Sequence, residues 1–229
     1  MFEPIAHAVP TDPITIPVWI DLAAVVVGSF SGILYAHQRE LDLVGYIGLA
    51  ILCGLGGGLI RDTIMQVGDV YILRSPYPIA VSVLTAIGFF FLPHALVRHP
   101  NVLEWVDIVA VALFAAAGTD KAIVYELHGI AVVFMGTMTA VGGGMLRDVF
   151  LGDVPRIFQR SNLYATCAIA GSAAYLACTR LLYLDKLIAL AVCMVVTIGL
   201  RRWSLHHDVY SFTDAELESH MERVLKKKK

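Results

Sequence analysis

The chain has 229 residues, of which 58% are hydrophobic and 16% charged, with a mean hydropathy of +0.72 and a formal net charge of −2. Soluble domains carry about 25% charged residues, so this composition points away from a soluble domain and indicates a polytopic membrane protein. The four cysteines show no CxxC spacing, which argues against a disulfide framework or a cysteine-based metal site.

The apolar stretches predict seven helices that cross a bilayer, for which about 20 residues are needed. The last of these helices is expected to be short. The polar chain that follows it ends in four consecutive lysines and is expected to contact anionic lipid headgroups. In chain order the predicted helices cover residues 16–37, 43–65, 77–97, 104–123, 129–151, 162–183 and 186–201.

A seven-residue segment occurs twice in the chain. Gly56-Gly57-Gly58-Leu59-Ile60-Arg61-Asp62 returns 86 residues later as Gly142-Gly143-Gly144-Met145-Leu146-Arg147-Asp148. The same offset, without a gap, aligns Trp19-Ile20-Asp21 with Trp105-Val106-Asp107 and Gly32 with Gly118. The chain therefore contains a duplicated membrane unit.

Each repeat contains three predicted helices, an odd number, so the second copy enters the membrane from the opposite face. We predict an all-α polytopic membrane protein with seven transmembrane helices, built as an inverted 3+3 repeat plus one helix. The predicted parts are an extracytoplasmic segment at 1–15, repeats at 16–100 and 101–184, a seventh helix at 185–203 and a cytoplasmic basic tail at 204–229.

The distribution of basic residues predicts the orientation. With the N-terminus outside, the inner segments contain Arg39, Arg98, Arg156 and the terminal lysines, whereas the outer segments contain Arg74 and Lys186. Because basic residues are enriched on the cytoplasmic side, we expect a multi-pass protein of the cell inner (plasma) membrane with its N-terminus outside and its C-terminus in the cytoplasm.

The glycine triplets are candidates for a functional bend or break in the second and fifth helices. Glycine weakens a helix by roughly 1 kcal/mol per residue relative to alanine, and the backbone groups freed by a break would favour ions near the membrane centre. The alternative is that the glycines only allow close helix packing. We expect the bend or break, at Gly56, Gly57, Gly58, Gly142, Gly143 and Gly144.

An arginine and an aspartate follow each triplet. Neighbours at i and i+1 do not face each other on a helix, so we expect Arg61 and Arg147 to pair with acids other than Asp62 and Asp148, and across the repeats. Such charges would line a pore or cavity. The alternative is that each arginine extends to the lipid headgroups.

Further polar residues lie in the first and fourth predicted helices. Asp21 and Asp107 are either first-turn acids that interact with the helix dipole or vestibule carboxylates that concentrate cations. Asp120-Lys121 aligns with Leu34-Tyr35, so this pair of charges breaks the internal symmetry and suggests a role for one half only, such as gating or voltage sensing. The alternative is a simple location at the membrane interface. The candidates for polar pore lining or gating are Ser29, Ser31, Thr119, Asp120 and Lys121.

These residues carry a resemblance to a known family. A pair of GGG-x-x-Arg-Asp motifs, in helices 2 and 5 of a seven-helix protein built as three plus three plus one, resembles the prokaryotic trimeric intracellular cation (TRIC) channels, over roughly residues 16–201. The same sequences resemble a bacterial family catalogued as glycine transporters. The resemblance implies a homotrimer with one hourglass pore per subunit, lined by helices bent at the glycines and conducting monovalent cations, chiefly potassium.

Two kinds of transport fit the residues. Arginines that are fully paired leave a near-neutral path for cations, whereas a free guanidinium beside a helix N-terminus would bind the carboxylate of an amino acid. We expect a cation channel with potassium or sodium as the permeant ion and with no cofactor or metal. The alternatives are a small amino-acid (glycine) transporter and a non-transporting membrane interaction protein. With no nucleophile–base pair or phosphate loop in the sequence, we expect neither an enzyme nor a nucleic-acid partner.

Overall fold

The computed structural model describes residues 17–66, 70–91, 101–159 and 163–209. The predicted N-terminal segment 1–15, the end of the predicted helix 77–97 and the tail from residue 210 lie outside the described residues. Within the described part the chain is helical and contains no strand. In order, the helices are α1 (Val18–Gln38), α2 (Leu43–Met65), α3 (Tyr71–Arg74), α4 (Tyr77–Phe91), α5 (Val102–Val124), α6 (Gly129–Phe150), α7 (Tyr164–Arg180) and α8 (Lys186–His206).

These helices confirm the predicted fold class, with two corrections. The last helix is not short: α8 has 21 residues, because the helix continues beyond its apolar run, through Arg201 and Arg202, to His206. The four-residue helix α3 was not predicted. Five helices, α1, α2, α5, α6 and α8, are long and apolar enough to cross a membrane, and α4 is a shorter apolar helix.

The first helix of each repeat ends in the same turn. Glu40 after α1 and Glu126 after α5 occupy equivalent repeat positions, and both have a left-handed backbone, with φ of 52° and 56°. In both turns an amide reaches back to the same carbonyl: Leu41 N–H bonds to Ala36 O and Leu127 N–H to Ala122 O, at 3.0 and 3.1 Å. This bonding satisfies carbonyls at the helix end and reverses the chain into α2 and α6.

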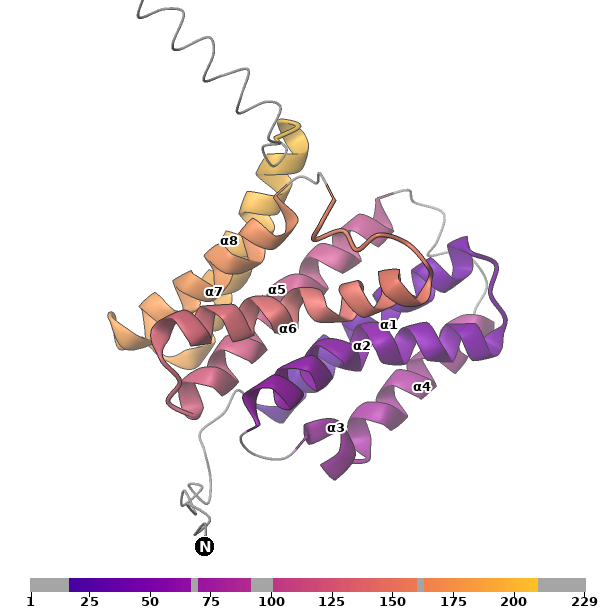
Figure 1. Cartoon of the computed structure of the whole chain (residues 1–229), viewed down its shortest axis with the longest axis horizontal. Coiled ribbons are helices and arrows are strands. Elements are labelled where there is room, and N and C mark those ends of the chain that lie inside the picture. Colours follow the sequence, from indigo (N-terminus) through magenta and orange to yellow (C-terminus); the bar gives the residue numbers. More distant parts are fainter. Residues whose placement is uncertain (1–16, 67–69, 92–100, 160–162, 210–229) are drawn as a thin grey trace, which may run out of the picture.

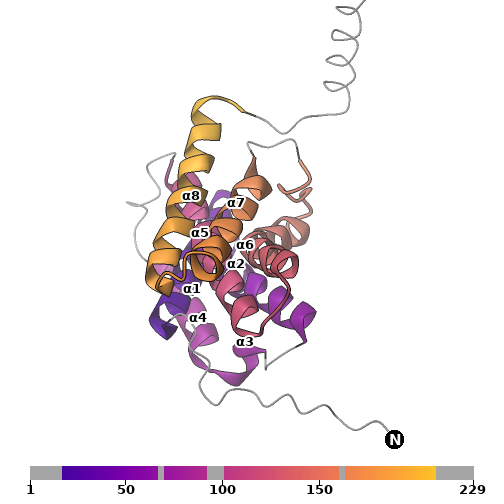
Figure 2. The same cartoon turned by 90° about the vertical axis from the view of Figure 1, so that its left-hand side faces the viewer.

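The repeats pack around a centre formed by α2 and α6 (Figure 1). In the first repeat α4 packs on α1 and α2, and in the second repeat α7 packs in the same way on α5 and α6. The two flanking helices lie on opposite sides of the centre, with α8 beside α7 and α5 (Figures 1 and 2). The outer faces are apolar at equivalent positions: Val44 and its counterpart Ile130 are 75% and 79% exposed, as expected for lipid-facing side chains.

Contacts between α2 and α6 are reciprocal. A β-carbon built on Gly57 would lie 2.1 Å from the carbonyl oxygen of Thr139, and one built on Gly143 would lie 2.5 Å from the carbonyl oxygen of Cys53. Cys53 and Thr139 are themselves 86 residues apart. Residue i contacting j while the counterpart of j contacts the counterpart of i is the signature of a two-fold axis. The axis passes between the two glycine triplets.

Candidate functional site

The glycine triplets do not break their helices. Both α2 and α6 are continuous through them, so of the predicted bend or break the break is wrong, and the bend stays a prediction. The first two glycines of each triplet instead allow the helices to cross at close range: a β-carbon on Gly56 would lie 2.7 Å from Leu146 Cδ1, and one on Gly142 would lie 3.0 Å from Ile60 Cδ1. Small residues serve this purpose at membrane helix crossings.

The third glycine of each triplet has a different neighbour. A β-carbon on Gly58 would lie 3.7 Å from Nη2 of Arg61, and one on Gly144 would lie 3.6 Å from Nη2 of Arg147. Residues three apart share one face of a helix, and long helical side chains turn back toward the N-terminus. Each guanidinium therefore lies back along its own helix, at ordinary van der Waals distance from the position of a β-carbon on the third glycine.

The first-repeat site consists of Asp21, Arg61, Asp62 and Lys121. Arg61 Nε donates to Asp62 Oδ1 at 2.7 Å, and Lys121 Nζ lies 2.7 Å from the same oxygen. The side chains of Arg61 and Asp62 are only 6% and 3% exposed. Asp21 lines the same space, a small cavity that reaches Gly58. The buried carboxylate is thus held by two cations, one from each repeat.

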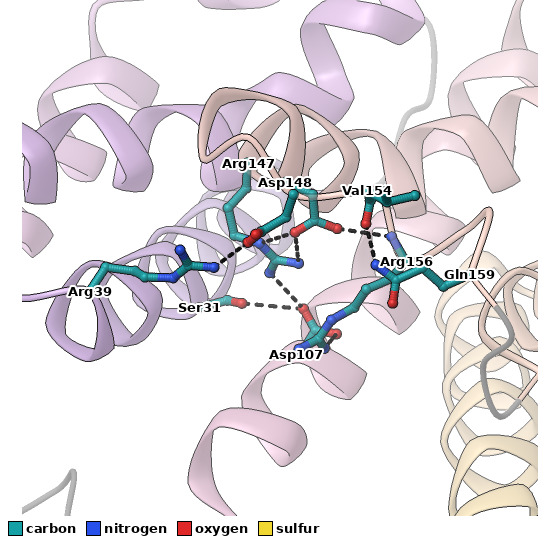
Figure 3. Close-up of polar contacts among 9 residues, drawn as sticks. Ser31, Arg39, Asp107, Arg147, Asp148, Val154, Arg156 and Gln159 are labelled. Carbon is teal, nitrogen blue, oxygen red and sulfur yellow. Dashed lines mark hydrogen bonds and ion pairs between the residues drawn. The ribbon is translucent and has the colours of Figure 1, made fainter.

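The second-repeat site contains Asp107, Arg147, Asp148 and Arg156, which Figure 3 shows, together with Tyr35. Arg147 Nε donates to Asp148 Oδ1 at 2.8 Å, and its Nη1 lies 3.5 Å from Asp107 Oδ1. The ring of Tyr35 lies beneath the same guanidinium, 3.7 Å from Cζ to the ring centroid. Arg147 is 1% exposed. A buried charge of this kind is tolerated because carboxylates and an aromatic face surround it.

The pairing of the arginines therefore differs from the prediction. Each arginine contacts the aspartate that follows it, which the helix geometry argued against, and Asp107, the second acid on Arg147, belongs to the same repeat. The predicted pairing of each arginine with an acid of the other repeat is wrong among the described residues. The physical reason is that each guanidinium bends back along its own helix, which brings its Nε to the carboxylate of the next residue. The links across the repeats are made instead by Lys121 with Asp62, by Ser31 with Asp107 and by Tyr35 beneath Arg147.

The two sites lie at opposite ends of α1. Asp21 belongs to the first-repeat site and Tyr35 to the second, and at 1.5 Å per residue their Cα atoms are about 21 Å apart along the helix. A second small cavity lies at the second-repeat site. Some of the residues that line the two cavities correspond under the repeat, among them Asp21 with Asp107, Gly58 with Gly144 and Arg61 with Arg147.

Phe114 of α5 lines both cavities and so separates them. Its counterpart in the first repeat is Gly28, which carries no side chain and faces the Phe114 ring: a β-carbon there would lie 2.7 Å from Phe114 Cε2. A single aromatic ring therefore occupies the junction. Phe114 was not among the predicted site residues, although the repeat alignment places it opposite a glycine, Gly28, in the sequence.

The remaining polar candidates separate into two groups. Ser31 lines the second cavity, and its Oγ donates to Asp107 Oδ1 at 3.3 Å. Ser29, Thr119 and Asp120 lie away from both cavities. Their Oγ, Oγ1 and Oδ1 atoms bond to Ser82 Oγ of α4, to the Ala115 carbonyl and to Tyr175 Oη of α7, respectively.

The charges of Asp120 and Lys121 point in different directions. Asp120 forms an ion pair with Lys186 of α8 at 2.7 Å, whereas Lys121 forms one with Asp62 of α2. Only Lys121 therefore belongs to a candidate site. Among the described residues, no group of three or more histidine, cysteine, aspartate or glutamate side chains is arranged to hold a metal ion.

Comparisons with known proteins agree with the duplicated architecture. The sequence profile described as glycine transporter matches residues 18–94 and again residues 104–180, two stretches whose starts and ends are each 86 residues apart. The predicted duplication is thereby confirmed, and the profile covers more than half of the chain.

Curated relatives are membrane proteins. The chain is 32% identical over 196 residues to the UPF0126 inner membrane protein YadS of Escherichia coli, covering 82% of this chain and 92% of that protein. It is 35% identical over 157 residues to a UPF0126 membrane protein of Deinococcus radiodurans, covering 68% and 73% of the two chains.

A solved structure of similar fold is the TRIC trimeric intracellular cation channel orthologue from Rhodobacter sphaeroides. It superposes with a TM-score of 0.76 at 28% identity and covers 84% of this chain and 98% of that one. The predicted resemblance to the prokaryotic TRIC channels and to the glycine transporter family is confirmed.

Proposed function

This chain belongs to the glycine transporter family and has the fold of the prokaryotic TRIC channels, and on that premise we propose that it is a cation channel of the cell inner membrane. Such a function requires no catalytic step. The observation that carries the proposal is the pair of repeat-related cavities, each containing carboxylates, that approach Phe114 from opposite ends of α1.

The proposed path runs within one chain. Cations enter one cavity, pass Phe114 and leave by the other, between α1, α2, α5 and α6. A hydrophobic constriction closes such a path by excluding water, and displacement of the Phe114 ring opens it. Since Gly28 stands at the counterpart position, one ring is sufficient for closure and no second ring has to move.

The charges at both ends favour a cation over an anion. Each motif arginine contacts at least one carboxylate, so neither guanidinium is free to bind an anion strongly. Asp21 and Asp107 face the two cavities and would attract small monovalent cations, for which we propose potassium with sodium as a competitor. We further propose a homotrimer with one path per subunit, an N-terminus outside and a C-terminus in the cytoplasm.

Planar bilayers test this proposal directly. The purified protein is reconstituted under a potassium chloride gradient, and the reversal potential of single-channel steps is measured. A cation channel gives discrete steps that reverse near the potassium equilibrium potential. Absence of steps at any voltage, from protein shown to be folded and inserted, would contradict the proposal.

The second candidate is an amino-acid transporter. One observation favours it besides the family description: the first cavity contains both a carboxylate, Asp21, and a guanidinium, Arg61, which match the ammonium and carboxylate groups of glycine. Against it stands the pairing of Arg61 with Asp62. Saturable uptake of labelled glycine by proteoliposomes, without single-channel steps, would establish this alternative.

A further inference from the structure

Each candidate site contains one cation besides its motif arginine, and the two cations come from different kinds of structure. In the first-repeat site it is Lys121, fixed within α5 and paired with Asp62. In the second-repeat site it is Arg156, whose Nη1 lies 3.9 Å from Asp107 Oδ2. Arg156 belongs to residues 151–159, a non-helical segment between α6 and α7 that we call the capping segment.

In the repeat alignment Arg156 has no charged counterpart, because the equivalent residue of the first repeat is Val70. Lys121 aligns with Tyr35 and likewise has no charged counterpart. Tyr35 connects the two arginines of the second-repeat site, because its ring centroid lies 3.7 Å from Arg147 Cζ and 5.2 Å from Arg156 Cζ. A charge on a helix cannot leave its site without repacking, whereas a charge on a connecting segment can.

Core packing anchors the backbone of the capping segment, because Ile157 lies against the main core cluster and Asp153 N–H donates to the Asp148 carbonyl at 2.8 Å. The charged side chains of the segment are held by exposed contacts. The backbone N–H of Arg156 donates to Asp148 Oδ2 at 3.0 Å, Gln159 bonds to the carbonyl of Val154, and Asp153 forms an ion pair with Arg39 at the end of α1 (Figure 3). The Arg39 and Asp153 side chains are 48% and 43% exposed, and that of Arg156 is 39% exposed. Exposed ion pairs contribute little and are screened by salt.

We propose that the capping segment is an electrostatic gate of the second-repeat site. In the closed arrangement Arg156 neutralises Asp107, and the Arg39–Asp153 ion pair fastens the segment to the first repeat. When that ion pair opens, Arg156 withdraws. Asp107 and Asp148 then share a single guanidinium, that of Arg147, and the cavity gains an uncompensated negative charge that attracts a monovalent cation. In the first-repeat site, among the described residues, the second cation is Lys121 on the helix α5, so the proposed gating acts on the second-repeat side.

This inference rests on the proposed channel function and deepens it. It predicts a higher open probability when the Arg156 charge or the Arg39–Asp153 ion pair is removed. It also predicts that open probability depends on ionic strength at one membrane face only. Screening of the Arg39–Asp153 pair by salt in the bath on that face favours the open arrangement. Salt on the opposite face reaches Lys121, whose pairing with Asp62 is buried and therefore little screened.

The test uses four variants of the full-length protein. Arg156→Gln removes the gating charge, Arg39→Asp breaks the fastening, and the exchange Arg39→Asp with Asp153→Arg restores it with reversed polarity. Arg180→Gln is the matched control, because Arg180 is an exposed arginine that bonds to the Leu127 carbonyl outside the capping segment. Single-channel open probability is measured in planar bilayers, and the melting temperature in detergent reports folding.

We expect Arg156→Gln and Arg39→Asp to raise the open probability about two- to fivefold, the range set by one exposed ion pair, with the exchange variant and Arg180→Gln close to wild type. A readout without conduction is the native Cys53, which lines the second cavity. Its modification rate by a small cationic thiol reagent, followed by peptide mass spectrometry, should rise in the same two variants and fall back in the exchange variant.

The outcomes separate the gate from the channel. If wild type conducts and all four variants resemble it in both readouts, the gate is wrong and the channel function stands. If wild type does not conduct but Cys53 reactivity follows the predicted order, the channel function fails and the gate remains. An Arg156→Gln variant that lowers open probability and Cys53 reactivity would overturn the gate outright.

Discussion

Gly57 of α2 faces the backbone of Thr139 of α6 so closely that a β-carbon on the glycine would lie 2.1 Å from the carbonyl oxygen. The contact is repeated about the two-fold axis by Gly143 and Cys53. The two halves of the protein are therefore held together by backbone against backbone, at the level in the membrane where the two cavities approach each other.

Replacing Gly57 by alanine is expected to destabilise the protein. A backbone oxygen cannot swing aside as a side chain does, so α2 and α6 must separate, at a cost of about 1–3 kcal/mol. The measurement is the melting temperature in detergent. Gly48→Ala is the control, because nothing lies within 4 Å of a β-carbon there, and equal melting temperatures for both variants would contradict the close crossing.

Asp62→Asn is expected to be strongly destabilising, since it leaves Arg61 and Lys121 without the carboxylate that both contact. Breaking a buried ion pair from one side costs about 3–5 kcal/mol. The comparison is Glu104→Gln at the half-exposed Arg202–Glu104 pair, where about 0–1 kcal/mol is expected. Urea or thermal unfolding in detergent gives both values, and a small effect of Asp62→Asn would mean that Asp62 is not the centre of the site.

Arg147→Lys is expected to impair conduction nearly as much as Arg147→Gln. Arg147 reaches Asp107 and Asp148 at once and covers the Tyr35 ring, and an ammonium group cannot reproduce that planar arrangement. Arg61→Lys should be milder, because Lys121 already neutralises Asp62. Single-channel conductance and open probability of the three variants test this order. Equal effects of Arg61→Lys and Arg147→Lys would contradict the idea that Lys121 makes the first-repeat site less dependent on its arginine.

Phe114→Ala is expected to raise the open probability or the unitary conductance, because the ring occupies the junction of the two cavities. The matched change is Phe134→Ala, which removes a ring that is 52% exposed on the outer face and should leave the current unchanged. A Phe114→Ala channel that conducts like wild type would place the barrier elsewhere along the path.

The orientation predicted from the basic residues is tested with cysteines at Ser219 and Thr11. An impermeant thiol reagent applied to intact cells should modify the cysteine at Thr11 and spare the one at Ser219. The opposite labelling would mean that the protein has the reverse orientation in the membrane and that the capping segment lies on the outer face.

Much of the fold could be predicted from the sequence, because it depends on local properties. Apolar runs of membrane-spanning length give the helices, as in α2, whose predicted and observed bounds both run from Leu43 to Met65. The offset of 86 residues gives the duplication, which the twofold match of the family profile confirms. An odd number of spans per repeat predicts the inversion, and the reciprocal contacts of α2 and α6 show the two-fold axis that the inversion requires.

Only the tertiary structure decided what the repeated residues do. The helices are not broken at the glycines, and Gly57 and Gly143 let α2 and α6 cross backbone against backbone. The arginines contact the next residue, because each guanidinium lies back along its own helix. The roles of Phe114, Tyr35 and Arg156 depend on which residues of the other repeat lie opposite them. A periodic pattern along one chain determines which face of a helix is apolar, but distances between residues far apart in sequence arise only when the helices pack.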